Sequence, residues 1–265
     1  MEAVAYADSP FRTQARYLAW RSVVRTARQL IMIVPTLVFP LFLLAINASG
    51  LSAATEIPGF PTDSYLTFAL AFPFIQGSIF ATNTAGTNLA EDIQNGFFNR
   101  LQLTPMRGSS LLAGQLAGVL MVAIVQAITY LLVGLAAGAH FEAGIWGVPV
   151  LFALSFAISA GFGAFGLFVG LRSGSGEAVQ GLFPLMFVLL FLSSASLPRD
   201  LIQQDWFQTA ATINPVSYVI EAVRSLFVTG WDREALALGF IVAISFFVVS
   251  MIAASFAMRE RLERT

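Results

Sequence analysis

The sequence predicts an all-α membrane protein with six transmembrane helices, on the evidence of its composition, its long apolar runs and the distribution of its arginines. Of the 265 residues, 57% are hydrophobic and 11% are charged, whereas a soluble domain usually carries about 25% charged residues. A soluble fold this apolar would leave large hydrophobic patches exposed. The apolar residues also form runs long enough to cross a bilayer, which takes roughly 20 residues in a helix.

Six apolar runs have the length of a membrane span. The first contains Pro35 and Pro40, so we expect a kinked helix. The second has a polar later half, the fourth is rich in glycines that allow close helix packing, and the fifth is the shortest. The predicted spans are residues 29–49, 65–86, 111–136, 145–170, 178–196 and 235–258. Residues 1–28 should form a cytoplasmic segment, and residues 29–265 a single six-span domain.

The arginines predict the orientation of the chain in the membrane. All fourteen basic residues are arginine, and an even number of spans places both termini on one side. Only Arg199, Arg224 and Arg233 would then lie on the opposite side, which leaves eleven on the side of the termini. Because cytoplasmic loops carry the excess of basic residues, we expect both termini in the cytoplasm and the chain in a bacterial plasma membrane.

The residue inventory excludes several kinds of site. The chain has no cysteine and a single histidine, His140, which excludes disulfides, cysteine nucleophiles and multi-histidine metal centres. It has no lysine, so it cannot form the phosphate-binding loop of a standard ATPase. Its net charge of −1 points to no nucleic acid. No acidic residue lies well inside a predicted span, which disfavours an intramembrane enzyme. We expect no bound metal, no cofactor and no catalytic residues.

Residues 1–28 carry an amphipathic pattern. On a helical projection Arg21, Arg25 and Arg28 share one face, while Phe11 and Leu18 lie on another. This pattern predicts an interfacial helix lying along the cytoplasmic membrane surface. The alternative is that these arginines only set the topology of the first span.

Residues 88–107, in the loop after the second span, carry a second amphipathic pattern. An apolar stripe recurs every four residues, at Leu89, Ile93, Phe97 and Leu101, and a polar stripe that includes Asp92 runs beside it. The pair Thr104–Pro105 should end this helix, and Gly96 should weaken it. Such a helix either lies on the membrane or docks into a groove on a partner protein.

The polar later half of the second span suggests a role in a transport pathway. A helix of this kind normally turns its polar side toward protein or water. Its candidates to face an internal cavity are Gln76, Thr82, Asn83 and Thr84. The alternative is that some of them only hold helices together.

Two motifs resemble the type-2 ABC export permeases. The run GFFNRLQLTPMRGSSLLAGQ, residues 96–115, is similar to the loop of that family in which an acidic stretch and a glycine precede Leu and Thr-Pro, and a later Leu-x-Gly opens the third span. The run INPVSYVIEAVRSLFVTG, residues 213–230, resembles the family's Asn-Pro motif with its later arginine. The Gly-Phe form is most similar to the daunorubicin-resistance subgroup. The chain departs from many relatives at Asn99–Arg100, where they carry a glutamate. The matching positions in the first motif are Asp92, Gly96, Arg100, Leu101, Thr104, Pro105, Leu112 and Gly114.

The resemblance implies a permease subunit of an ATP-driven exporter of amphipathic drugs, antibiotics or lipids. Two permease chains, identical or paralogous, would pair with two ATP-binding subunits, which would hold the ATP and Mg²⁺. Residues 88–107 would be the coupling helix that docks on the ATP-binding subunit. The residues implied in coupling are Asp92, Ile93, Gly96, Phe97, Phe98, Arg100, Leu101, Thr104 and Pro105. Two other classes stay open at this point, namely a secondary transporter and a membrane scaffold.

The resemblance also implies re-entrant helices in the outer leaflet between the fifth and sixth spans. Asn214–Pro215 would form the turn between two short helices, with Asn214 capping the second. Glu221 and Arg224, three residues apart on that helix, could pair. The alternative is an ordinary outer loop with a surface helix.

Overall fold

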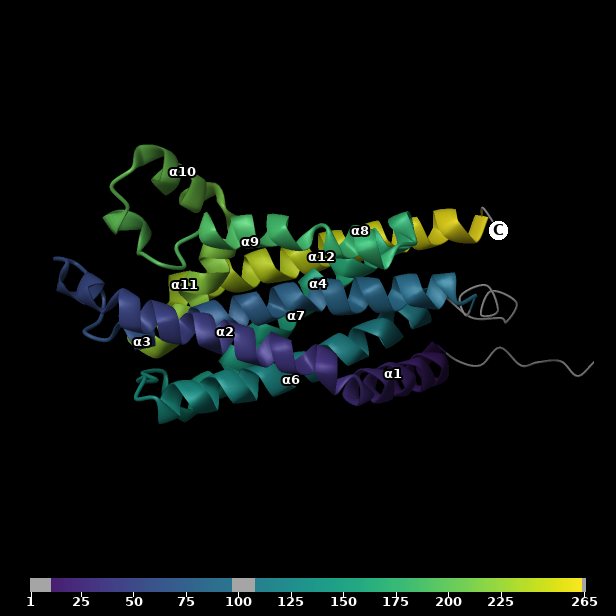
Figure 1. The fold of residues 1–265 in the computed structure, drawn as a ribbon, viewed down its shortest axis with the longest axis horizontal. Helices are drawn as coiled ribbons and strands as arrows, with labels where there is room; N and C mark the ends of the chain where they lie inside the picture. The colour runs from purple at the N-terminus through teal and green to yellow at the C-terminus, as the bar shows by residue number, and fades with distance from the viewer. Residues whose placement is uncertain (1–10, 97–107, 264–265) are drawn as a thin grey trace, which may run out of the picture.

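The computed structural model describes residues 11–96 and 108–263, and every regular element within them is a helix. Five helical stretches are long and apolar enough to cross a membrane. They run along one bundle, with α1 and the chain's C-terminus at the same end (Figure 1), which we call the base. The five stretches are α2 (Leu30–Gly50), α3 with α4 (Tyr65–Ala69 and Ala71–Gln94), α6 (Gly108–Ala136), α7 (Gly144–Ser173) and α12 (Arg233–Glu263).

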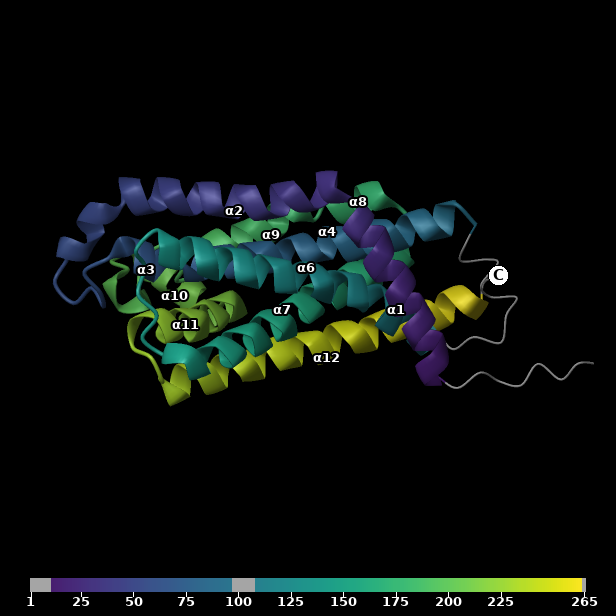
Figure 2. The same ribbon diagram turned by 90° about the horizontal axis from the view of Figure 1, so that it is seen from below.

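Helix α1 (Phe11–Arg28) lies across the base. Figure 2 shows it running at a steep angle to the long helices of the bundle. It packs mainly on α6. A helix therefore precedes the first membrane-length helix, and Gln29 separates it from α2. Its position at a membrane surface stays a prediction.

Helix α2 contains Pro35 and Pro40, the two prolines from which a kink was predicted. Because proline has no N–H, Pro40 leaves the Thr36 carbonyl without its usual helical donor. The Tyr130 hydroxyl of α6 donates to that carbonyl at an O–O distance of 2.5 Å. The proline thus creates an acceptor that joins two helices inside the bundle.

The predicted second span, 65–86, is longer in the structure and is interrupted near its start. Helix α3 ends at Ala69, and α4 begins at Ala71 and continues to Gln94. Pro73 accounts for the interruption, because its ring and missing N–H disfavour a helical bond to Ala69. The prediction of a separate loop helix over 88–107 is wrong for its first seven residues, which continue α4. The helix ends where Gly96 takes a positive φ of 67°.

Helices α4 and α7 form the closest pair in the bundle. A Cβ on Gly166 would lie 2.2 Å from the Thr82 carbonyl oxygen, and one on Gly170 would lie 2.7 Å from that of Gly86. Ser78 and Ser159 bond across the same interface at 2.9 Å. The glycines predicted to allow close packing therefore let the two backbones touch, as small residues do in membrane bundles.

The predicted fifth span, 178–196, is not one span-length helix. It consists of α8 (Gly176–Gln180) and α9 (Phe183–Phe191), which together form an apolar stretch shorter than the five others. Figure 1 shows α8 toward the base and α9 leading away from it. The stretch therefore carries the chain from the end of α7 toward the start of α12.

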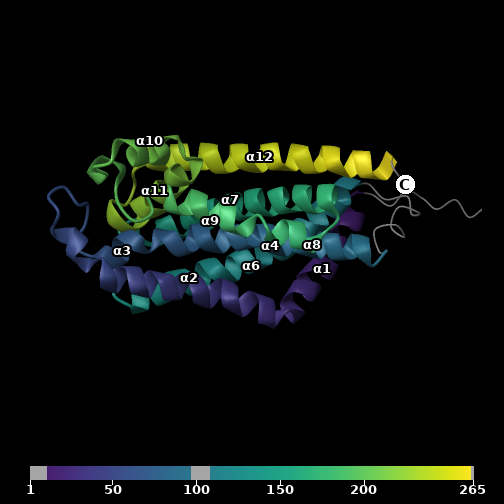
Figure 3. The same ribbon diagram turned by 45° about the horizontal axis from the view of Figure 1, so that its top comes forward.

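The end opposite the base, called the far end, holds five of the short elements. They are η1 (Ser52–Glu56), α3, η2 (Arg199–Leu201), α10 (Asp205–Ile213) and α11 (Pro215–Val228). Figure 3 shows α10 and α11 gathered at this end beside the start of α12. Most of α11 is buried, whereas α10 buries only Ala211. The segment after the fifth predicted span therefore contains η2 and two unlike α-helices, α11 inside the bundle and α10 at its surface.

Candidate functional site

A cluster of charged and polar side chains joins α1, α4 and α6 at the base. The Asp92 carboxylate accepts bonds from Arg21 at 3.1 and 2.9 Å, from Arg25 at 2.8 Å and from the Gln115 amide at 2.9 Å. Arg25 also bonds Glu91 at 2.5 Å. These five residues are called the basal cluster. Asp92 is only 5% exposed, so its charge depends on these donors for compensation.

Two glycines of α6 bring α1 close enough for the basal cluster to form. A Cβ on Gly114 would lie 2.4 Å from the Leu18 Cβ, and one on Gly118 would lie 2.6 Å from the Ser22 hydroxyl. The same hydroxyl donates to the Gln115 carbonyl at 3.2 Å. Glycine at both positions therefore places Arg21 and Arg25 within reach of the last turn of α4.

The structure places the three predicted interfacial arginines differently from one another. Arg21 and Arg25 bind carboxylates of α4, whereas Arg28 is exposed at the end of α1. The aromatic residues Tyr17 and Trp20 are 74% and 70% exposed. The buried residues of α1 are polar, namely Gln14, Ser22 and Thr26. The helix thus packs through its polar side and presents aromatic rings outward.

The predicted coupling residues divide at Gly96. Asp92 and Ile93 are buried within the chain, at 5% and 9% exposed, so neither side chain presents a surface to a partner in this conformation. The helical periodicity of residues 88–94, which predicted a separate amphipathic helix, is that of the last turns of α4. The other predicted coupling residues lie outside the described residues, namely Phe97, Phe98, Arg100, Leu101, Thr104 and Pro105.

The four predicted pathway residues of α4 have three different environments. Thr82 donates to the Phe162 carbonyl of α7 at 3.1 Å, so it holds helices together. Asn83 and Thr84 line a groove of about 510 Å³ between α2, α4 and the α8–α9 stretch. Gln76 is fully buried, and within the described residues neither its amide nitrogen nor its amide oxygen has a hydrogen-bond partner; the same holds for the Asn83 side-chain oxygen.

Aromatic rings border the groove. Phe80 of α4 lies with its ring centroid 4.9 Å from Phe183 of α9 and 6.5 Å from Phe39 of α2. Gln76, Phe80 and Asn83 follow one another at helical spacing, so they share one side of α4. The groove therefore combines an aromatic wall with the Asn83 amide, whose oxygen has no described partner, while Gln76 is buried beside it and does not line it.

At the far end, Asn214 and Pro215 start α11 as predicted from the sequence. The Asn214 side chain accepts from the Val216 N–H at 2.9 Å, which is an N-cap bond. Its amide nitrogen donates to the Leu189 and Leu192 carbonyls at 2.6 and 3.0 Å. These carbonyls belong to the end of α9, where a helix lacks internal donors. One asparagine therefore caps two helix ends.

The predicted pairing of Glu221 with Arg224 is replaced by other contacts. Glu221 pairs with Arg199 of η2 at 2.5 Å. Arg224 is 7% exposed and donates to three carbonyls, those of Phe68, Ser194 and Ala195, at 3.2, 2.7 and 2.9 Å. Arginine stays protonated in proteins, so these three carbonyls bond a charged guanidinium. Arg224 therefore ties α11 to both the α3–α4 break and the chain after α9.

Three residues of these clusters had no role in the sequence-based prediction, namely Glu91, Gln115 and Arg199. Glu91 could have been found, because it adjoins Asp92 and faces a helix with arginines four residues apart. Gln115 and Arg199 come from distant parts of the chain, and their contacts depend on tertiary packing. Over residues 11–96 and 108–263, no group of three or more His, Cys, Asp or Glu side chains could hold a metal ion.

Comparison with known proteins agrees with the predicted resemblance. The chain matches the ABC-2 type transporter family over residues 13–228. It is 30% identical over 171 residues to the daunorubicin resistance ABC transporter permease protein DrrB1 of Streptomyces coeruleorubidus; that alignment covers 62% of this chain and 58% of the relative. The relative belongs to the subgroup predicted from the Gly-Phe motif, which confirms that resemblance. The chain therefore belongs to the ABC-2 type transporter family and is a membrane permease of it.

Proposed function

We propose that this permease is the membrane subunit of an ATP-driven exporter and that the basal cluster couples it to a separate ATP-binding subunit. The carrying observation is the position of Asp92, in the last turns of α4 and within the predicted coupling segment, residues 88–107, of which residues 97–107 are called the docking segment. Its carboxylate joins α4 to α1 and α6. A displacement of the docking segment would therefore move three helices together.

The proposed mechanism uses two ATP-binding subunits and two permease chains. ATP and Mg²⁺ would bind to the partner subunits, and closure of that pair would draw the two docking segments together. Such coupling needs a structural element with two conformations, and both ATP binding and substrate binding must shift the equilibrium between them. The proposed element is the α1–α4–α6 unit, and Phe97, Phe98 and Leu101 would seat in the partner's groove.

The groove beside α4 is the proposed pathway for an amphipathic substrate. Aromatic rings would accommodate its apolar part, and the amide of Asn83 would bond its polar groups. Gln76, buried on the same side of α4, would join the pathway when the groove opens further. Ligand sites commonly combine an apolar lining with a few polar groups. The daunorubicin-resistance relative supports a drug as one such substrate.

The proposed topology has six crossings with both termini in the cytoplasm. The α8–α9 stretch would be the fifth crossing in chain order, because it carries the chain away from the base between α7 and α12. Its shortness would be offset by the turn that follows it and by α11, which would form the re-entrant helix of the outer leaflet. Helix α1 would lie in the inner interface, where exposed Tyr17 and Trp20 suit the boundary of the membrane.

The test is export and ATP hydrolysis by the chain coexpressed with its ATP-binding subunit. The wild-type pair should copurify, and substrate should stimulate hydrolysis. Asp92→Asn and Glu91→Gln should lower export per ATP by about tenfold, the scale of a coupling change of about 1–2 kcal/mol. Copurification should persist, since both side chains bond within the permease.

The matched control is Glu177→Gln, an exposed carboxylate in the first turn of α8. It should leave export unchanged. Failure of the wild-type chain to bind an ATP-binding subunit would contradict the exporter assignment. Export by the cluster variants at the level of this control would contradict the coupling role of the basal cluster alone.

A further inference from the structure

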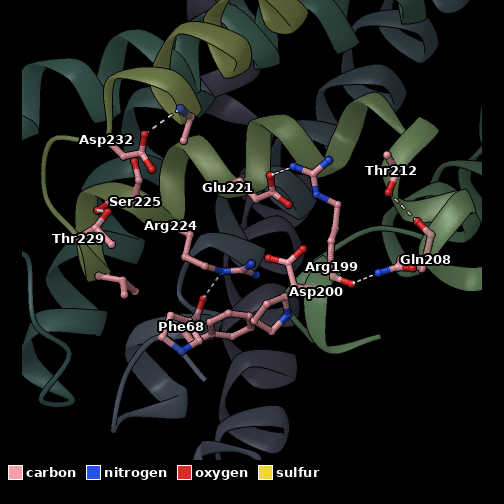
Figure 4. Close-up of a pocket in the computed structure, with 14 residues that line it drawn as sticks. Phe68, Arg199, Asp200, Gln208, Thr212, Glu221, Arg224, Ser225, Thr229 and Asp232 are labelled. Carbon is pink, nitrogen blue, oxygen red and sulfur yellow. Dashed lines mark hydrogen bonds and ion pairs between the residues drawn. The ribbon is translucent and has the colours of Figure 1, made fainter. Parts of the chain in front are cut away.

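A second cavity, of about 510 Å³, opens at the far end between α3, η2, α10, α11 and the start of α12. We call it the far-end cavity. Its volume lies within the range of about 300–1,000 Å³ typical of small-molecule sites. Two arginines and three carboxylates line it. Figure 4 shows them around the cavity, with the Asp200 carboxylate near the guanidinium groups of Arg224 and Arg199 in this view.

Most of these charges are already engaged. Glu221 pairs with Arg199. Asp232 accepts from the backbone N–H groups of Glu234 and Ala235, both at 3.1 Å, at the start of α12. Arg224 and Asp200 are the two exceptions among the described charged residues of this lining. Arg224 bonds only carbonyls, and Asp200 is exposed with no bonded partner in the described part of the chain.

Arg224 lines the cavity and has one guanidinium nitrogen without a bond to any described residue. Nε and Nη2 are bonded to carbonyls, whereas Nη1 has no bond to any described residue and is not among the fully buried unbonded atoms. Arg224 is only 7% exposed, so packing holds its side chain in position. The cavity therefore has a deep, preformed cationic donor.

The geometry of the donor suits a phosphate. Carboxylates and phosphates both pair well with two parallel N–H groups of one arginine, but both such edges of this guanidinium include Nη2, which carbonyls occupy. A phosphate has oxygens in several directions and accepts a single-point contact from Nη1. The negative rim at Asp200 then suits a cation that lies on the solvent side of the phosphate.

The lining also selects between kinds of cation. Quaternary ammonium groups are recognised by aromatic faces. The aromatic residue of this lining is Phe68, and Arg224 already covers its ring, with the guanidinium carbon 3.5 Å from the ring centroid. Asp200 instead offers carboxylate oxygens, which accept from the N–H groups of a primary ammonium. The rim therefore suits ethanolamine better than choline.

We propose that the far-end cavity binds a phosphoethanolamine zwitterion, with its phosphate at Arg224 and its ammonium at Asp200. The source is either the headgroup of phosphatidylethanolamine from the bilayer or a soluble phosphoethanolamine compound. The site is separate from the α2–α4–α9 groove, so it does not depend on the transport function proposed above.

The test is calorimetric titration of the delipidated full-length chain in detergent. The probes are dihexanoyl phosphatidylethanolamine, the matching phosphatidylcholine and phosphatidylglycerol, and free phosphoethanolamine. The ethanolamine lipid should bind about tenfold more tightly than the other two lipids, as expected for one charge-assisted hydrogen bond. Free phosphoethanolamine binding as tightly as that lipid would assign a soluble source, and much weaker binding would assign the bilayer.

Asp200→Asn keeps the fold intact, because that carboxylate is exposed and has no bonded partner in the described chain. It should reduce the preference for ethanolamine over glycerol headgroups about tenfold. The matched control is Asp205→Asn, an exposed carboxylate on α10 that does not line the cavity. Equal binding of all three lipids to the wild type, or equal effects of the two substitutions, would overturn the proposal.

Discussion

At the scale of single residues, side chains from neighbouring helices bond carbonyls at helix ends and breaks. Tyr130 bonds the Thr36 carbonyl left by Pro40, and Asn214 bonds two carbonyls at the end of α9. Arg224 bonds the Phe68 carbonyl beside the α3–α4 break. In a membrane, backbone polar groups must find partners within the protein. These three irregularities are thus also links between helices.

The link between Tyr130 and Thr36 can be tested with a double-mutant cycle. Tyr130→Phe should destabilise the chain by about 1 kcal/mol, since it removes one buried hydrogen bond. Pro40→Ala restores an N–H that bonds the Thr36 carbonyl within α2. In that background Tyr130→Phe should have a smaller effect, measured as the shift of the thermal unfolding midpoint. Equal effects in both backgrounds would show that the proline does not create the acceptor.

At the scale of helices, α4 organises the bundle. It packs against α7 along its length and contacts α2, α6, α8, α9 and α11. Its C-terminal turns carry Asp92, and its middle turns carry the residues of the groove. Because Gly86, Gly166 and Gly170 bring backbone to backbone, α4 and α7 have little room to slide. We expect them to move as one unit.

Gly166→Ala tests this close packing. The added Cβ would lie 2.2 Å from the Thr82 carbonyl oxygen, so the helices must separate, and overpacking of this kind costs about 1–3 kcal/mol. Gly50→Ala is the control, because a Cβ there meets nothing within 4 Å. The unfolding midpoint in detergent should fall for the first variant and stay unchanged for the second. A similar midpoint for both would mean that α4 and α7 separate easily.

At the scale of the whole molecule, the two ends of the bundle differ in chemistry. The base is held by ion pairs between α1, α4 and α6, whereas the far end is held by Arg224, Asn214 and the carbonyls they bond. Gln76 lies on α4 between these ends and keeps an unsatisfied amide inside the described bundle. A buried unsatisfied amide lowers stability, so its presence is consistent with a role in binding substrate.

Gln76→Met separates stability from transport. Removing the unsatisfied amide should stabilise the chain by about 1–2 kcal/mol and should lower export of an amphipathic drug. Gln126→Met is the comparison, because the Gln126 amide donates to the Gly77 carbonyl at 3.4 Å and its loss should not stabilise. Thermal unfolding and drug export by cells would be measured for both. Unchanged export in Gln76→Met would remove that residue from the pathway.

Sequence patterns alone determined the membrane class, the family and most helix positions. The length of an apolar run needed to cross a membrane is set by the bilayer thickness, and the two motifs are defined by the order of residues along the chain. Neither therefore needs tertiary information. Pattern analysis also located Asn214 as a cap, because capping is a local bond. The six-span count and the cytoplasmic termini stay predictions.

Only the tertiary structure decided what the polar residues bind. Residues 88–94 would show the same helical periodicity in a separate surface helix and at the end of a long helix. The periodicity therefore could not show that Asp92 is buried among Arg21, Arg25 and Gln115. Glu221 was predicted to bind its neighbour on the same helix, yet Arg199 reaches it from another segment. Charged side chains bind the partner that packing brings closest, and packing joins residues that are remote in the sequence.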